Sequence, residues 1–181
     1  MNTSDYHMVS LSTILDTGGD VVALKMLRTF SPIKDSEAGE FLNEKAITME
    51  KRDLSRTFLA IGKDDCTILG FYTLGMKCIH IPNGSCLPNN VLKMCNIEPS
   101  TNMAQAYLLG QLARSSSSPK GFGDTLIESA KTKLRESKKN VGCRMLRLDC
   151  VDELVPYYSK HGFINIRKNK DKDLNQMMVF I

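Results

Sequence analysis

Apolar and polar residues follow two different periods along this chain, and the switches between them predict a mixture of strands and helices. A period of two, or a short continuous apolar run, indicates a strand, whereas a period near 3.6 indicates a helix. Strands are expected at residues 9–15, 56–62, 67–81, 105–114, 143–150, 162–167 and 174–181. Helices are expected at residues 21–27, 35–51 and 91–94, from residue 122 onward, and at 152–161.

Two of the expected helices carry a continuous apolar face. In the helix from residue 35, where Asp35 and Ser36 offer N-terminal caps, this face is formed by Ala38, Phe41, Leu42, Ala46 and Met49. In the helix from residue 122 it is formed by Phe122, Leu126, Ala130 and Leu134. The last helix contains Pro156, which fits only in a first turn, and Gly162 follows it in the position of a C-terminal cap.

The order of the elements predicts a fold of the α/β (α+β mixed) class. Strands and helices are interspersed, without the strict alternation of a doubly wound sheet. The length of 181 residues is typical of one domain and suffices to bury a sizeable core, so residues 1–181 are expected to form a single domain.

Composition narrows the class of protein. The chain is 42% hydrophobic and 24% charged, typical of a globular domain, and no apolar run approaches the roughly 18 residues of a membrane span. The first residues lack the pattern of a secretory signal, so a cytoplasmic protein with mostly free thiols is expected. The six cysteines contain no Cys-x-x-Cys pair, and no metal is expected, although Cys78 and His80 would face the same side of a strand.

The net charge of +4 is modest, and basic residues are concentrated at 131–139 and 167–173. Such runs are usually solvated faces, but they also suit a polyanion such as RNA. Arg114 and Lys120, together with Lys131, Lys133, Arg135, Lys138 and Lys139, would contribute to a basic surface.

Residues 115–134, "SSSSPKGFGDTLIESAKTKL", offer three interpretations as a phosphate site. A Walker loop is excluded because Lys120 precedes Gly121 instead of following it. A dinucleotide fingerprint is excluded because Leu126 stands where a third glycine belongs. The third interpretation is a helix N-terminus whose glycines let the backbone approach a pyrophosphate, with Lys120 adding a charge. A flexible serine-rich loop that only caps the helix is the alternative.

The neighbouring segments bear on this choice. The order "YLLGQLAR", "SSSSPKGFGDTLIESA", "CRMLRLDC" and "PYYSKHGF" resembles the GCN5-related N-acetyltransferase (GNAT) family. Residues 118–123 match its signature Gln/Arg-x-x-Gly-x-Gly/Ala, and residues 158–163 match its Tyr, three residues, then Gly-Phe. Ser118 departs from the signature's Gln or Arg. The first half resembles the toxins of bacterial toxin–antitoxin pairs that acetylate the α-amine of aminoacyl-tRNA.

The resemblance implies a fold, a co-substrate and the residues that hold it. The fold would be a central twisted mixed sheet of about six to seven strands flanked by helices, with an acceptor-side half at about 1–103 and an acetyl-CoA-binding half at about 104–181. Two parallel strands would splay apart to hold acetyl-CoA. The residues expected to bind it are Leu112, Ala113, Arg114, Ser118, Pro119, Lys120, Gly121, Phe122, Gly123, Asp124 and Thr125.

The resemblance also implies direct attack of an amine on the thioester. A backbone N–H near Leu112 would stabilise the oxyanion. Tyr158 would be the catalytic acid for the leaving thiolate, because a phenol is protonated at neutral pH. Glu98, Asp149 and His161 are available as bases, but none is singled out, and an α-amine with a pKa of about 7.7 needs none.

The sequence leaves two acceptors open. One is charged tRNA, whose acetylation would inhibit translation, and the other is a small-molecule or peptide amine. A non-catalytic CoA-binding module of the same fold is the alternative from another class. An antitoxin protein would be the partner of a toxin, a homodimer is compatible with the sequence, and no membrane partner is expected.

Overall fold

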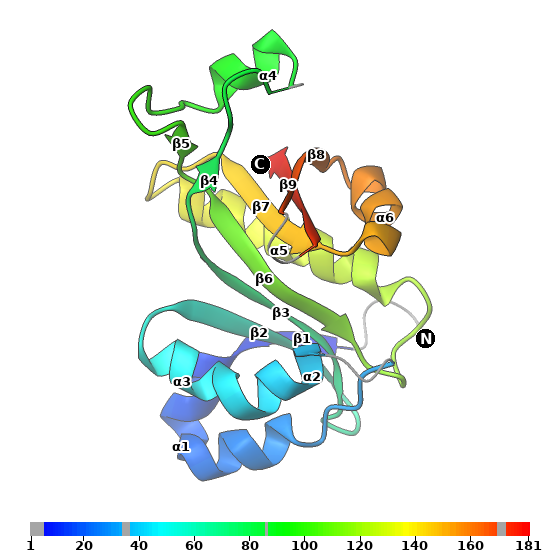
Figure 1. The fold of residues 1–181 in the computed structure, drawn as a ribbon. Helices are drawn as coiled ribbons and strands as arrows, with labels where there is room; N and C mark the ends of the chain where they lie inside the picture. The colour runs from blue at the N-terminus through cyan, green and yellow to red at the C-terminus, as the bar shows by residue number, and fades with distance from the viewer. Residues whose placement is uncertain (1–5, 34–36, 86, 170–172) are drawn as a thin grey trace. The chain divides into compact units, whose positions relative to one another are not determined.

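The computed structural model describes residues 6–33, 37–85, 87–169 and 173–181 (Figure 1). Within these residues, a sheet of seven strands has the order β1-β2-β3-β6-β7-β9-β8, and β4 and β5 form a separate pair. The strands are β1 Tyr6–Ser10, β2 Ser55–Gly62, β3 Ile68–Met76, β4 Ile79–His80, β5 Met103–Ala104, β6 Tyr107–Arg114, β7 Met145–Cys150, β8 Ile164–Asn169 and β9 Leu174–Phe180. The helices are α1 Leu11–Leu27, α2 Glu37–Glu40, α3 Ala46–Lys51, α4 Asn89–Met94, α5 Phe122–Lys138 and α6 Val155–Lys160. The predicted mixed α+β class and strand number are confirmed.

The chain divides into two compact units, which we describe separately. The first unit comprises Met1–Gly75 and Gly110–Ala130, and the second comprises Met76–Leu109 and Lys131–Ile181. None of the described helices is both long and apolar enough to cross a membrane.

In the first unit, helices cover both faces of an antiparallel sheet. Helices α1 and α3 contact β2 on one face (Figure 1). In this layer Phe30 and Phe71 pack edge to face with their ring centroids 5.3 Å apart. On the other face, the Tyr72 hydroxyl lies 3.1 Å from Ser129 Oγ of α5. Because successive strand residues point to opposite faces, Phe71 packs on the face covered by α1 and α3, and Tyr72 packs on the face covered by α5.

The strand expected at residues 9–15 is wrong beyond Ser10. Strand β1 ends at Ser10, whose side chain accepts the N–H of Thr13 and caps helix α1. A Ser N-cap ahead of Leu11 favours helix, and burial of Leu11 and Leu27 stabilises it. The helix passes through Gly18 and Gly19, with a kink at Gly19, whose φ is 69°.

The helix expected at 35–51 is confirmed from residue 37, whereas its expected caps, Asp35 and Ser36, lie outside the described residues. A π-helical segment, Phe41–Lys45, joins α2 to α3. Four of the five residues of the expected apolar face are buried: Ala38, Phe41, Leu42 and Ala46.

In the second unit, β9 lies between β7 and β8 and is antiparallel to both. One face of this sheet carries Met145 and Met178, which belong to a core formed with β4, β5 and the segment around α4. Pro156 lies in the first turn of α6, as expected, and Gly162 follows the helix with a φ of 82°.

Strand β6 belongs to both units. At its start, in the second unit, it is parallel to β7, with Tyr107 opposite Leu146 and Leu108 opposite Arg147. Both strands continue beyond this register, β6 to Arg114 and β7 to Cys150.

A buried carboxylate closes the turn that leads into β2. Glu50 is 4% exposed, and its Oε2 accepts the N–H of Thr57 at 2.8 Å. Its Oε1 lies 3.3 Å from Arg56 Nη1. Burial raises the pKa of Glu50, while Thr57 and Arg56 oppose that shift.

We expect Glu50→Ala to lower the free energy of unfolding by about 1–3 kcal/mol, because the buried Thr57 N–H loses its acceptor. Glu50→Gln keeps an acceptor oxygen for the Thr57 N–H, so it should lower the free energy of unfolding by less than Glu50→Ala does. Since the folded-state pKa of Glu50 is raised, its contribution is complete below the ordinary carboxyl pKa and falls as pH rises through the raised value. The cost of Glu50→Gln should therefore be smaller at pH 7 than at pH 4. Urea unfolding of both variants at both pH values measures this, and an equal loss for Ala and Gln would contradict it.

Candidate active site

The serine run between β6 and α5 is a hydrogen-bonded turn. Ser115 is buried, and its N–H donates to Leu69 O at 2.8 Å. Ser116 N donates to Ser31 O at 2.9 Å, and Ser117 N donates to Ser115 Oγ at 3.3 Å. The buried Ser118 hydroxyl donates to Ser115 O at 2.7 Å. These bonds fix the start of the loop, which argues against a flexible linker.

The second part of the loop presents backbone donors. The N–H groups of Phe122 and Asp124 donate to Pro119 O and Gly121 O. Those of Lys120, Gly121 and Gly123 make no backbone hydrogen bond within the described residues. Gly121 has a φ of 85°, and open space lies where its Cβ would be. A pyrophosphate would therefore meet fewer amides than the whole range 118–125 that was expected.

These donors lie at the N-terminus of α5, a helix of 17 residues. Its dipole places partial positive charge there, and the Lys120 ammonium adds a full charge. The Phe122 side chain is not on this surface: its ring is buried and packs edge to face against Tyr6, with centroids 5.2 Å apart.

A cavity of about 390 Å³ adjoins the loop within the first unit. Pro119, Lys120, Gly121, Phe122 and Thr125 line it from the loop and helix. The remaining walls come from β1, from β2 and β3 with the turn between them, and from the serine run; their residues are Tyr6, Gly62, Lys63, Asp64, Asp65, Thr67, Leu69 and Ser117. Five of the residues predicted to bind acetyl-CoA thus line the same cavity.

The end of β6 is anchored from β3. Gln111 N donates to the buried Thr73 Oγ1 at 2.9 Å. Gly70 of β3 approaches β6 so closely that a Cβ there would lie 2.9 Å from Ala113 O and 3.3 Å from Arg114 Cα. Leu112, Ala113 and Arg114 are each half-buried. Packing from β3 therefore sets the position of the backbone expected to hold the pantetheine arm.

In the second unit, Tyr158 of α6 is 8% exposed. Its ring packs against Phe163, with centroids 5.7 Å apart, and against Tyr157, with centroids 5.2 Å apart. Burial, and secondarily the charge of Cys150, raises the pKa of Tyr158 to about 12. Because its pKa is raised, the hydroxyl holds its proton at neutral pH. The hydroxyl makes no hydrogen bond to any described residue, so it is available as a donor.

The structure distinguishes the three residues considered as bases. The Asp149 carboxylate is held by Arg147, with Nη2 to Oδ1 at 2.5 Å. Glu98 Oε1 accepts the hydroxyl of Ser100 at 3.1 Å. His161 ends α6, where its ring packs 5.1 Å from Tyr157.

The expected basic surface is smaller than the sequence suggested. Lys131 is buried, and its ammonium donates to His161 O at 2.9 Å. Lys133 pairs with Glu136 at 3.1 Å, and Lys138 donates to Ile181 O. Lys133 lies on another side of helix α5 than Lys131, so these residues do not form one continuous basic face.

Several supporting residues were missed by the sequence analysis. Thr73, Ser31 and Gly70 fix the loop and the end of β6 from distant segments. No local sequence motif predicts contacts between such distant segments.

The sequence matches no known protein-family profile and no curated protein. Solved structures do match. A tyrosine-to-phenylalanine mutant of KacT aligns with a TM-score of 0.75 and 17% identity, over 98% of this chain and 95% of that one. AtaT complexed with acetyl-methionyl-tRNAfMet aligns with a TM-score of 0.73 and 18% identity, over 95% of this chain and 94% of that one. A mutant AtaT toxin bound to acetyl-CoA and the C-terminus of the antitoxin AtaR aligns with a TM-score of 0.71 and 18% identity, over 98% of this chain and 94% of that one.

These alignments span nearly the whole chain and agree with the resemblance carried by residues 118–123 and 158–163. The fold of this protein is the fold of KacT and of the toxin AtaT.

Proposed function

We propose that this protein is an N-acetyltransferase that moves an acetyl group from acetyl-CoA to the α-amine of aminoacyl-tRNA. The observation that carries the proposal is the glycine loop at the start of α5, in a chain with the KacT and AtaT fold. The open backbone donors of this loop, the α5 dipole and Lys120 suit the pyrophosphate of acetyl-CoA.

Strand β6 would hold the pantetheine arm. Its register with β7 covers Tyr107 and Leu108, whereas the strand continues to Arg114. The splay of the two parallel strands remains a prediction. The amides of acetyl-CoA would pair with Leu112, Ala113 and Arg114, and the Leu112 N–H would stabilise the oxyanion.

Tyr158 would act as the acid. The acceptor nitrogen attacks the thioester carbonyl carbon, the carbon–sulfur bond breaks, and the Tyr158 hydroxyl gives its proton to the departing sulfur. The proton released by the amine passes to water, and the phenolate regains one from solvent. A pKa of about 12 keeps Tyr158 protonated between cycles.

The acceptor is inferred from the neighbours. AtaT is solved with acetyl-methionyl-tRNAfMet and with the antitoxin AtaR. By analogy, this chain would acetylate charged tRNA in the cytoplasm and be neutralised by an antitoxin protein. A small-molecule or peptide amine, the alternative that the sequence left open, is the second candidate acceptor.

The test is to mix the purified protein with labelled acetyl-CoA and a total pool of charged tRNA. We expect label in the tRNA fraction, released together with the amino acid on mild deacylation. Uncharged tRNA is the control and should remain unlabelled. Label on uncharged tRNA, or none on charged tRNA while coenzyme A still binds, would overturn the proposed acceptor. Absence of coenzyme A binding would overturn the acetyltransferase proposal.

A further inference from the structure

A second cavity, of about 440 Å³, lies wholly within the second unit, and we call it the α4 pocket. It is lined by the end of α4, the residues before β6, the end of α5 and the start of β7, with Lys93, Asn96, Gln105, Lys138, Arg144 and Met145 among its residues. Its volume falls in the range of about 300–1,000 Å³ typical of small-ligand sites. Tyr158 and the glycine loop do not line it.

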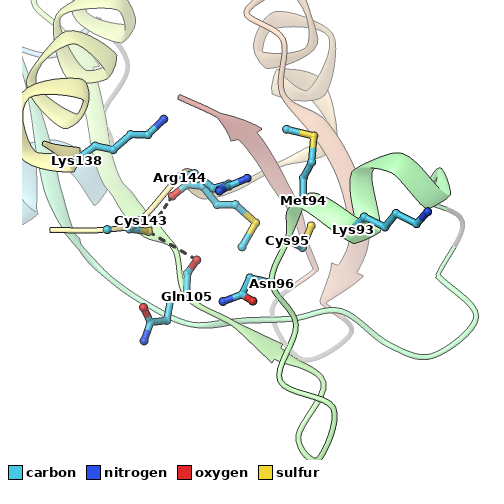
Figure 2. A pocket seen from close by; sticks show the side chains of 10 residues that line it. Lys93, Met94, Cys95, Asn96, Gln105, Lys138, Cys143 and Arg144 are labelled. Atoms are coloured by element: carbon cyan, nitrogen blue, oxygen red, sulfur yellow. Dashed lines mark hydrogen bonds between the residues drawn. The ribbon is translucent and has the colours of Figure 1, made fainter.

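Three cationic side chains line the α4 pocket. They belong to Lys93, Lys138 and Arg144, and none of its described lining residues is acidic. Lys138 donates to the backbone oxygen of Ile181. The side chains of Lys93 and Arg144 make no ion pair or hydrogen bond within residues 6–33, 37–85, 87–169 and 173–181. Figure 2 shows Arg144 at the centre of the view, with the two lysines toward opposite ends. A guanidinium in such a setting is a bidentate donor for phosphate.

The remaining walls suit a flat, polar-edged group. Asn96 and Gln105 present side-chain amides, which both donate and accept hydrogen bonds, as base edges do (Figure 2). Met94, which is 41% exposed, adds a polarizable thioether, and such groups pack well against aromatic rings. The backbone here is tied together, because Cys143 Sγ lies 3.7 Å from both Gln105 O and Met145 O.

We propose that the α4 pocket binds a nucleotide, its phosphate at Arg144 and its base against Met94, Asn96 and Gln105. The nucleotide is either a free nucleoside monophosphate or one unpaired nucleotide of a single-stranded RNA, since both carry the same phosphate and base. The site is independent of acetyl transfer and goes beyond the proposed function.

Calorimetric titration of the full chain with AMP, GMP, CMP and UMP, each with coenzyme A at saturation, tests the proposal. At least one nucleotide should bind, the matching nucleoside should bind at least about tenfold more weakly, and Arg144→Gln should weaken binding about tenfold or more. Lys139→Gln is the matched control, because Lys139 is exposed, neighbours Lys138 and does not line the pocket. It should leave binding within about twofold.

Four results would overturn the proposal: no binding of any nucleotide, equal binding of the nucleoside, equal losses in the Arg144 and Lys139 variants, or displacement of the nucleotide by coenzyme A. Thermal unfolding of Arg144→Gln checks that the variant is folded. If it is not, Gln105→Leu replaces it and should reduce the differences in affinity among the four nucleotides.

A titration with single-stranded RNA hexamers distinguishes the two sources. Binding that Arg144→Gln weakens assigns an RNA nucleotide, and no binding of RNA assigns the free nucleotide. The Tyr158→Phe variant should bind nucleotide like the unchanged protein, so failure of acetyl transfer and failure of this site are separable.

Discussion

Replacing Tyr158 with phenylalanine is expected to lower kcat about 100-fold or more, while the dissociation constant of acetyl-CoA stays within about twofold. The substitution removes only the hydroxyl, which makes no hydrogen bond to a described residue. The ring contacts with Phe163 and Tyr157 are kept, so the fold should survive. Thiol release during turnover gives kcat, and calorimetry gives the affinity for acetyl-CoA.

Tyr157→Phe is the matched control, since it makes the same change one residue earlier on α6. We expect its kcat to stay within about threefold of the unchanged protein. A Tyr158→Phe variant with undiminished kcat, or equal losses in both variants, would remove Tyr158 from the mechanism.

The pH dependence of kcat provides a second readout of Tyr158. Its folded-state pKa is raised from about 10 to about 12, so the acid form persists through pH 10. The stability linked to this proton is complete below pH 10 and is lost as pH rises toward 12. We therefore expect no alkaline fall in kcat between pH 8 and 10 beyond that of the Tyr158→Phe variant. A fall near pH 9 that the variant lacks would contradict the assignment.

Gly70→Ala is expected to disturb both stability and co-substrate binding. A Cβ at residue 70 would lie 2.8 Å from Leu126 Cδ1 and 2.9 Å from Ala113 O. Leu126 can move its side chain, but the Ala113 carbonyl can move only with the backbone of β6. We expect a loss of about 1–3 kcal/mol in the free energy of unfolding and about tenfold weaker acetyl-CoA binding, because Ala113 and Arg114 shift. Thermal unfolding and calorimetry measure the two effects.

Gly39→Ala is the control for this change. At that helical position the added Cβ meets only the Pro32 ring, at 3.2 Å, and a helix favours alanine over glycine. Both stability and acetyl-CoA binding should be nearly unchanged. If Gly70→Ala behaves like Gly39→Ala, the approach of β3 does not set the position of β6.

Local patterns located most elements, with two clear failures. The single strand expected at 67–81 is two strands, β3 and β4, which lie in different sheets. The strand expected at 9–15 is helical from Leu11. Residues 9–15 have strand-like composition, but Ser10 caps a helix that is stabilised by packing Leu11 and Leu27 into the core of the first unit. The face of α5 was predictable because its apolar residues recur at helical spacing, and all four are buried. The basic residues of α5 were misjudged, because whether Lys131 is solvated depends on what packs beside it.

The sequence alone predicted the α+β class and the glycine loop ahead of a helix, because periodicity and motif spacing are local properties of the chain. The resemblance to the GNAT family, and not the periodicity, implied Tyr158 as the acid. Tertiary structure alone decided which loop amides remain open, how Ser31, Gly70 and Thr73 hold the loop and β6, and why the pKa of Tyr158 rises to about 12. It also brought Lys93, Gln105 and Arg144 to one pocket from segments up to 51 residues apart in number, 93 to 144. Contacts between such distant segments leave no periodic signal, because they depend on how the chain folds back on itself.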